Sequence, residues 1–319
     1  MYKFTPILKT LVWGTESWVL SGVPGNESVV AEGPEAGKKI TDLYPGQFPL
    51  LIKFIDAKRD LSIQVHPNNK LAAERHGCSG KSEMWYVIGA EPGAKLISGL
   101  KEAITPEDYV RLVAEHRITE VLAEHTVAPG DVFYLPAGRI HSIGGGCFLA
   151  EIQQTSDITY RIYDYNRPGL DGKPRQLHTQ QAIDAIDYQV YPNYRTPYEP
   201  KPNAPVELVR SPYFTTTLYD FSGTSAAPAP LSGSASLAPD PTRENGFAGA
   251  LSLPDICQFG LDPESPFQIA LGLYGSGVLR TAKGEATLSA GEAVLIPASD
   301  GSVRVEPGPD GLRMLTTHP

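Results

Sequence analysis

The sequence has few cysteines, no run of basic residues and no long apolar segment near its start. Its three cysteines, Cys78, Cys147 and Cys257, are odd in number and far apart, and no CxxC pair occurs. Neither a disulfide framework nor a cysteine zinc site is therefore expected. Lys and Arg number 27 against 36 for Asp and Glu, a net charge of −9, which disfavours nucleic acid as a partner.

The first twenty residues contain two lysines, a glutamate and two tryptophans, with no continuous apolar stretch. A signal peptide and a membrane span are not expected, and the sequence predicts a cytoplasmic protein. A chain of 319 residues with 41% hydrophobic content suits two moderate cores better than one large core. Two lobes are the starting expectation.

Short apolar runs separated by Gly and Pro turns fill much of the chain, a pattern typical of β-structure with long connections. Residues 48–55 form the first strong predicted strand. Asn69 is expected to cap a short helix that ends at Gly77. Thr105 predicts the start of a second helical region, whose apolar spacing continues to about Glu124.

The stretch Ser62-Ile-Gln-Val-His66 places two metal-capable groups on one face of a predicted strand. Alternate side chains of a strand point to the same side, so Gln64 and His66 project together while the residues between them face apolar packing. Pro67 then ends the strand. For this stretch alone, a strand edge that carries polar residues outward is an equally good interpretation.

Two further charged residues lie in apolar strand patterns. Glu83 shares a strand face with Trp85 and Val87, where a carboxylate needs a partner and a cation is the natural one. Lys53 lies inside the apolar run 48–55, which normally excludes a lysine unless its ammonium reaches a cavity or an anion. A lysine that snorkels from a strand edge is the alternative.

Residues 129–141 read Pro-Gly-Asp-Val-Phe-Tyr-Leu-Pro-Ala-Gly-Arg-Ile-His. This pattern predicts a glycine turn, a strand, a second turn and a histidine that is aimed inward at the start of the next strand. The spacing of Gly130, Pro136, Gly138 and His141 resembles the second motif of the cupin superfamily. A match over thirteen residues is far more specific than a lone histidine.

Three stretches carry a narrower resemblance: Leu-Ser-Ile-Gln-Val-His-Pro at 61–67, Gly-Lys-Ser-Glu-Met-Trp-Tyr at 80–86 and Tyr-Leu-Pro-Ala-Gly-Arg-Ile-His at 134–141. Together with residues 12–14 and 151–164, they look like the type I mannose-6-phosphate isomerases. The resemblance covers residues 5–190. It implies a zinc enzyme that interconverts mannose 6-phosphate and fructose 6-phosphate through a metal-stabilised cis-enediolate.

The resemblance also implies the residues of a catalytic metal site. One Zn²⁺ per chain would be held by four side chains: Gln64, His66, Glu83 and His141. Such nitrogen and oxygen ligands suit a borderline divalent ion and leave room for substrate. Arg161 falls on the family's active-site arginine and would add positive charge beside the intermediate, unless it pairs with Asp157 or Asp164. Lys81 is a candidate acid or base.

A phosphosugar is the implied partner, and its contacts are expected from cationic and hydroxyl groups. Lys53, Ser62 and Lys81 match family positions that line the pocket, where they suit phosphate or sugar hydroxyls. Arg167 is a second candidate for the phosphate. One departure concerns Gly80, because many relatives have there a histidine that is sometimes proposed as the proton carrier. The base is therefore unassigned.

The expected fold is mainly β, with two jelly-roll (cupin) β-sandwich lobes and a few short helices inserted in the first. Residues 1–190 are predicted to form the catalytic metal-binding lobe, 191–205 a Pro-rich linker and 206–319 a degenerate lobe. Within that lobe, 222–245 is rich in Ala, Ser, Pro and Gly and is expected to be a long loop.

The second lobe repeats part of the first. Gly291, five residues and Pro297 repeat the spacing of Gly130, five residues and Pro136, which indicates an internal duplication. No histidine follows Pro297 before His318, so this lobe is expected to hold no metal.

Two other functions are compatible with a cupin fold. One is a sugar-binding or regulatory cupin without turnover, which the complete ligand set makes less attractive. The other is an iron-dependent cupin oxygenase, whose site usually needs two histidines and a carboxylate. The pair Gln64 and His66 argues against it. The sequence leaves the native metal, the anomer preference and the choice between monomer and homodimer open.

Overall fold

The computed structural model describes residues 1–221 and 258–319, so the loop predicted at 222–245 lies outside the described residues. The chain forms two compact units. The larger unit comprises Ile7–Glu27 and Tyr44–Thr196, and the smaller unit comprises Met1–Pro6, Ser28–Leu43 and Pro197–Pro319. The chain thus passes between the units after Thr196, inside the predicted linker. No sequence pattern indicated that the first six residues belong to the smaller unit.

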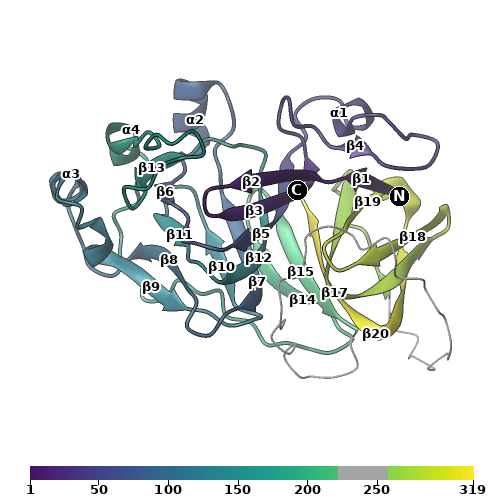
Figure 1. Cartoon of the computed structure of the whole chain (residues 1–319). Coiled ribbons are helices and arrows are strands. Elements are labelled where there is room, and N and C mark those ends of the chain that lie inside the picture. Colours follow the sequence, from purple (N-terminus) through teal and green to yellow (C-terminus); the bar gives the residue numbers. More distant parts are fainter. Residues whose placement is uncertain (222–257) are drawn as a thin grey trace. The chain divides into compact units, whose positions relative to one another are not determined.

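The larger unit is a β-sandwich of two antiparallel sheets (Figure 1). One sheet has the strand order β10-β7-β12-β5-β3-β2. Its strands are β2 Ile7–Leu11, β3 Gly14–Ser21, β5 Leu50–Ala57, β7 Glu83–Ala90, β10 Val132–Leu135 and β12 Cys147–Gln154. The other sheet has the order β13-β6-β11-β8-β9. Its strands are β6 Ile63–Val65, β8 Lys95–Leu100, β9 Leu122–Thr126, β11 His141–Ile143 and β13 Tyr160–Tyr163. The expected mainly β fold is confirmed.

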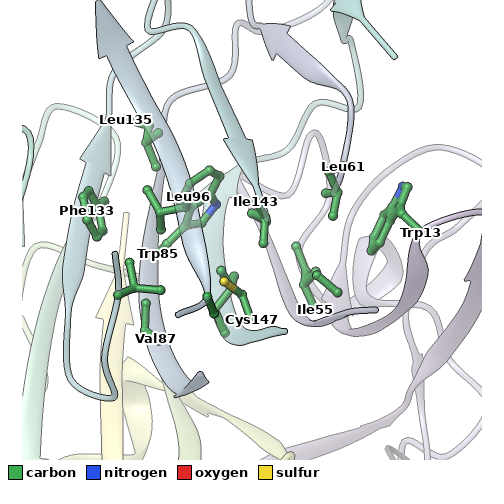
Figure 2. Packing of buried hydrophobic residues seen from close by; sticks show 14 residues of the cluster. Trp13, Ile55, Leu61, Trp85, Val87, Leu96, Phe133, Leu135, Ile143 and Cys147 are labelled. Carbon is green, nitrogen blue, oxygen red and sulfur yellow. The ribbon is translucent and has the colours of Figure 1, made fainter. Parts of the chain in front are cut away.

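An apolar core joins the two sheets. Trp85 and Phe133 are cross-strand neighbours on β7 and β10 and are fully buried. Figure 2 shows them in one cluster with Leu96 and Ile143 of the other sheet. Each such side chain contributes roughly 1.5–3 kcal/mol when it leaves water. Glu83 lies two residues before Trp85 and therefore shares the inner face of its sheet.

The larger unit also contains three short helices: α2 Asn69–His76, α3 Pro106–Ala114 and α4 Thr179–Ile183. Asn68, and not the predicted Asn69, caps α2, because its side chain accepts a hydrogen bond from Leu71 N at 2.9 Å. Gly77 ends α2 in a left-handed conformation, as predicted. Within the described residues, no helix combines the length and the apolar character that crossing a membrane requires.

The helix predicted from Thr105 begins as expected but ends early. Thr105 and Asp108 form a capping box at the start of α3. A 3₁₀ turn then covers Ile118–Val121 and leads directly into β9. The prediction of helix to Glu124 is wrong, because residues from Leu122 onward pair with β8 and sheet pairing overrides the local apolar spacing.

The smaller unit is built on a nine-stranded sheet with the path β14-β15-β20-β17-β19-β1-β4, where β16 pairs with β20 and β18 with β17. Its elements are β1 Tyr2–Thr5, β4 Val29–Val30, α1 Ile40–Leu43, β14 Val206–Arg210, β15 Thr215–Asp220, β16 Gln258–Phe259, β17 Phe267–Thr281, β18 Gly284–Ser289, β19 Ala293–Pro297, a 3₁₀ turn Ala298–Asp300 and β20 Val303–His318. A separate apolar core, with Leu279, Val294 and Met314, stabilises this unit.

Candidate metal centre

Strands β6 and β11 bring three of the predicted ligands together. Gln64 and His141 are direct neighbours across this antiparallel pair, so their side chains leave the sheet on the same side. His66 follows Gln64 by two residues and shares that side. The imidazole centroids of His66 and His141 are 4.8 Å apart, and Gln64 Nε2 lies 3.3 Å from His141 Nε2.

Glu83, the first residue of β7, reaches the same point from the opposite sheet. Its Oε1 lies 3.3 Å from His141 Nε2, and its Oε2 lies 3.6 Å from His66 Nε2. All three side chains are buried, and their ligand atoms lie within 4.8 Å of one another. Two atoms that bind one zinc ion at about 2.1 Å and at tetrahedral angles are about 3.4 Å apart. The observed spacing fits a single ion.

Backbone carbonyls decide which nitrogen of each histidine faces this point. His66 Nδ1 lies 2.8 Å from Ile158 O, and His141 Nδ1 lies 2.8 Å from Arg139 O. A carbonyl only accepts, so each Nδ1 donates, and the lone pair of each neutral ring is on Nε2, which faces the other predicted ligands. Burial, together with the charge of Lys81, lowers the pKa of His66, and burial lowers the pKa of His141. Both rings are therefore neutral near pH 7.

Glu83 and Gln64 complete a donor set for a divalent ion. Both oxygens of Glu83 are buried, and neither accepts a hydrogen bond within the described part of the chain. The ammonium of Lys81, 2.8 Å from Oε2, is an ion-pair partner. A half-turn of the Gln64 amide would present its oxygen in place of Nε2. Two imidazoles, a carboxylate and an amide oxygen suit zinc or a similar borderline ion.

Buried charges of alternating sign continue from Glu83 along the inner face of its sheet. Lys81 lies between two carboxylates, with Nζ 2.8 Å from Glu83 Oε2 and 3.9 Å from Glu151 Oε1. Glu151 Oε1 pairs in turn with Lys53 Nζ at 2.8 Å, and Glu151 Oε2 accepts a hydrogen bond from Trp85 Nε1 at 2.9 Å. All four charged side chains are buried, and each has an opposite charge beside it, as burial requires.

Glu151 is thus the anion that a buried Lys53 needs. Burial alone lowers the pKa of Lys53, but the carboxylate of Glu151 raises it above its ordinary value. Burial alone raises the pKa of Glu151, but Lys53 and Lys81 lower it below its ordinary value. No role was predicted for Glu151 from the sequence, although a carboxylate inside the apolar strand Cys147–Gln154 is the same signal that singled out Glu83.

Arg161 lies beside the candidate metal centre as the cross-strand neighbour of Gln64 on β13. Its Nη1 donates to a backbone carbonyl at 3.0 Å, and its Nε is buried without a hydrogen-bond partner among the described residues. The alternative ion pair with Asp164 does not form, because Arg167 and Arg175 occupy both oxygens of that carboxylate. Within the described residues, Arg161 therefore forms an ion pair with neither Asp157 nor Asp164, although the charge of Asp164 still acts on it.

Three arginines and one aspartate form a cationic cluster: Arg161, Arg167, Arg175 and Asp164. Arg167 Nε donates to Asp164 Oδ1 at 3.0 Å, and Arg175 donates to both oxygens at 2.6 Å. Three positive charges and one negative charge leave +2 in a protein whose net charge is −9. Arg175 was not predicted from the sequence, because nothing in the spacing of the polar segment after β13 indicates that Arg175 pairs with Asp164.

Two further positions singled out in the sequence, Ser62 and Gly80, lie just before β6 and β7. Ser62 is buried directly before β6 and precedes Gln64 by two residues. At Gly80, an added Cβ would lie 2.5 Å from Asn68 C and 2.5 Å from Asn69 N, closer than a side chain approaches backbone. A histidine at this position therefore cannot be accommodated by this backbone.

Comparison with known proteins identifies the family. Residues 15–86, which include three of the four predicted ligands, match the model of the phosphomannose isomerase type I catalytic domain. Mannose-6-phosphate isomerase ManA of Bacillus subtilis is 35% identical over 262 residues, or 73% of this chain and 80% of that protein. The mannose-6-phosphate isomerase of Streptococcus mutans is 38% identical over 220 residues, or 65% and 69% of the two chains.

Solved structures show the same fold. The crystal structure of the mannose 6-phosphate isomerase from Bacillus subtilis matches with a TM-score of 0.79 at 27% identity, over 100% of this chain and 99% of that one. A phosphomannose isomerase mutant from Salmonella typhimurium matches with a TM-score of 0.71 at 14% identity and over 100% and 99% of the chains, which shows the fold alone. Identity, coverage and fold agree, and this chain belongs to the type I mannose-6-phosphate isomerase family.

Proposed function

We propose that this chain interconverts mannose 6-phosphate and fructose 6-phosphate. The observation that carries the proposal is the convergence of His66 Nε2, His141 Nε2 and the Glu83 carboxylate at one buried point, with Arg161 next to it in the sheet. The family relatives are named for this aldose–ketose isomerisation, and the charges beside the site suit a phosphorylated sugar.

We propose that one Zn²⁺ per chain is the cofactor, held by Gln64, His66, Glu83 and His141. A donor set of nitrogen and oxygen without cysteine supports a catalytic rather than a structural ion. When bound, zinc supplies Lewis-acid stabilisation of negative charge on sugar oxygens. The contribution of the chain is to hold two neutral, oriented imidazoles, through the carbonyls of Ile158 and Arg139.

The reaction moves a carbonyl between C1 and C2, so a C–H proton must be removed and a cis-enediolate stabilised. We assign part of that stabilisation to Arg161, whose buried Nε has a hydrogen-bond donor to offer. Lys81 is the proposed group that moves protons, since its Nζ lies 3.1 Å from His66 Nε2, at the edge of the ligand cluster. Gly80, the residue before Lys81, has no side chain that could move a proton.

The substrate phosphate is proposed to lie near Lys53, Ser62 and Arg167. Arg167 belongs to a cluster of net charge +2, which suits a dianion. Lys53 already pairs with Glu151. Its proposed contribution is therefore positive electrostatic potential, and not a direct hydrogen bond to the phosphate. Ser62 precedes Gln64 by two residues, so its hydroxyl projects from the same side of the extended chain. There it suits a sugar or phosphate oxygen.

A coupled assay with mannose 6-phosphate tests the proposal. We expect turnover in the purified protein, loss of turnover after chelation and recovery on addition of Zn²⁺. The His141→Ala variant should bind no stoichiometric metal by elemental analysis and should not recover. Full turnover after complete metal removal, or full metal occupancy in His141→Ala, would contradict the proposed site.

A further inference from the structure

Arg139, in the turn before His141, packs against two tyrosine rings whose planes meet at 69°. Its guanidinium carbon lies 4.6 Å from the ring centroid of Tyr191 and 4.6 Å from that of Tyr194. The residue is only 8% exposed. The two ring centroids are 6.0 Å apart, so the guanidinium lies in the angle between the rings and is attracted by both. We refer to Arg139, Tyr191 and Tyr194 as the arginine–tyrosine clamp.

Tyr194 is itself fixed against β8. Its hydroxyl donates to Leu100 O at 2.6 Å. Its ring packs so closely on Gly99 that a Cβ there would lie 2.1 Å from a ring carbon, and Gly99 has a left-handed φ of +81°. Gly99 N also donates to Ile140 O at 2.8 Å. The ring that holds Arg139 is therefore attached to the strand beside β11.

Backbone hydrogen bonds tie the same turn to the other histidine. Asp187 N donates to Gly138 O at 2.8 Å, and Gly138 N donates to His66 O at 2.9 Å. The hydroxyl of Tyr191 donates to Asp187 Oδ2 at 2.8 Å. Residues 187–194 thus hold the turn through its backbone and through the Arg139 side chain.

Arg139 links this clamp to the candidate metal centre through its own backbone. Its carbonyl accepts the Nδ1 proton of His141 at 2.8 Å, the bond that leaves Nε2 facing Glu83. Rotation of this peptide would displace a side chain that packs on both rings. The direction of the carbonyl, and with it the orientation of the imidazole, is therefore constrained by the clamp.

We infer that the arginine–tyrosine clamp is a positioning device that holds His141 for metal binding and so sets the affinity of the site for a divalent ion. The inference rests on the proposed metal site. It gives the first residues of the predicted linker, 191–194, a part in the site. Residues that orient a metal-bound histidine typically change metal affinity by about 10–100-fold when they are replaced.

Titration of the metal-free protein with Co²⁺, followed by visible absorption, tests the clamp. Arg139→Met keeps the unbranched stem and removes the guanidinium. We expect its Co²⁺ dissociation constant to rise by about 10–100-fold and its absorption bands to change, because the ligand geometry is altered. Arg139→Lys, which restores the charge without the planar group, should recover part of the affinity.

Arg195→Met is the matched control. Arg195 lies on the same segment, has its guanidinium carbon 5.5 Å from the Phe133 centroid and pairs with Asp131 at 3.5 Å, but it has no bond to the His141 turn. We expect an unchanged Co²⁺ spectrum and affinity, whatever its effect on urea unfolding. A merely structural role of Arg139 would lower the stability of Arg139→Met and leave its Co²⁺ binding unchanged.

The outcomes separate the two proposals. If the wild-type protein does not bind Co²⁺ with one-to-one stoichiometry, the metal site itself is wrong. If it does, and Arg139→Met binds Co²⁺ within twofold and with the same spectrum, the positioning role is wrong. Should Arg139→Met fail to fold, Tyr191→Leu removes one ring of the clamp and is judged by the same two readouts.

Discussion

At the scale of single residues, the inner face of the six-stranded sheet shows how charge can be buried. Lys53 and Glu151 are 98 positions apart in the chain, yet they are direct neighbours across β5 and β12. Removing either ion from water alone would cost several kcal/mol, which an opposite charge at 2.8 Å offsets. The row of alternating charges is therefore stable only as a set.

We expect Glu151→Gln to lower the free energy of unfolding by about 3–5 kcal/mol, because it leaves the Lys53 ammonium buried without its closest anion. Glutamine keeps the volume and can still accept the Trp85 hydrogen bond, so the effect isolates the charge. Urea unfolding measures it. Glu124→Gln is the control, since Glu124 pairs with Lys95 where both side chains are about half exposed, and it should change stability by less than about 1 kcal/mol. Equal losses in both variants would contradict the role of Glu151.

Arg161→Lys separates a catalytic arginine from a structural one. Lysine keeps the positive charge but lacks Nε and the planar fork. We expect kcat/KM for mannose 6-phosphate to fall at least tenfold, equivalent to about 1.4 kcal/mol, while urea unfolding changes by less than about 1 kcal/mol. Unchanged kcat together with reduced stability would show that Arg161 is structural.

At the scale of elements, the connection from α2 to β7 leaves no room for a side chain at position 80. The segment after α2 runs so close to residues 67–69 that only glycine fits at position 80. Lys81 N also donates to Pro67 O at 3.1 Å, and Gly80 N donates to Asn69 Oδ1 at 2.9 Å. This tight connection delivers Lys81 and Glu83 to the ligand cluster.

We expect Gly80→Ala to lower the free energy of unfolding by about 1–3 kcal/mol, as overpacking against rigid backbone does. Neither Gly80 nor the control position, Gly260, has a left-handed φ, and a Cβ on Gly260 would meet no atom of the described residues within 4 Å. Gly260→Ala should therefore leave urea unfolding unchanged or slightly raise stability. A Gly80→Ala variant as stable as wild type would show that the connection shifts readily.

At the scale of the whole molecule, the same hairpin turn occurs once in each compact unit. Gly130 precedes β10 with φ +94°, and Gly291 precedes β19 with φ +86°. Both values lie in the left-handed region that favours glycine. The two glycines of the predicted repeat thus share one backbone conformation, while the converging His66, Glu83 and His141 lie in the larger unit.

Metal binding should stabilise the larger unit selectively. Zn²⁺ at 100 times its dissociation constant adds about 2.7 kcal/mol to a state that binds it. Hydrogen exchange with and without chelator should therefore show metal-dependent protection in β6, β7 and β11. The strand β15 of the smaller unit is the internal control and should not change. Uniform protection across both units, or none, would contradict a site confined to the larger unit.

Local sequence patterns determined much of the site. The period of two along a strand placed Gln64 with His66, and a carboxylate in an apolar strand pointed to Glu83. The motif that ends at His141 predicted the turn and the inward histidine. These features follow from neighbours in the chain, whose directions are set by backbone geometry. The family resemblance, carried by the same residues, predicted the activity.

Tertiary structure decided the features that depend on strand pairing between distant segments. It placed Glu151 against Lys53, closed position 80 to any side chain and returned Arg175 to Asp164. It also ended the helical region before Leu122, because pairing with β8 outweighs local apolar spacing. Sequence periodicity fixes the side on which a residue projects but not which distant residue it meets, since cross-strand partners depend on the packing of the whole sandwich.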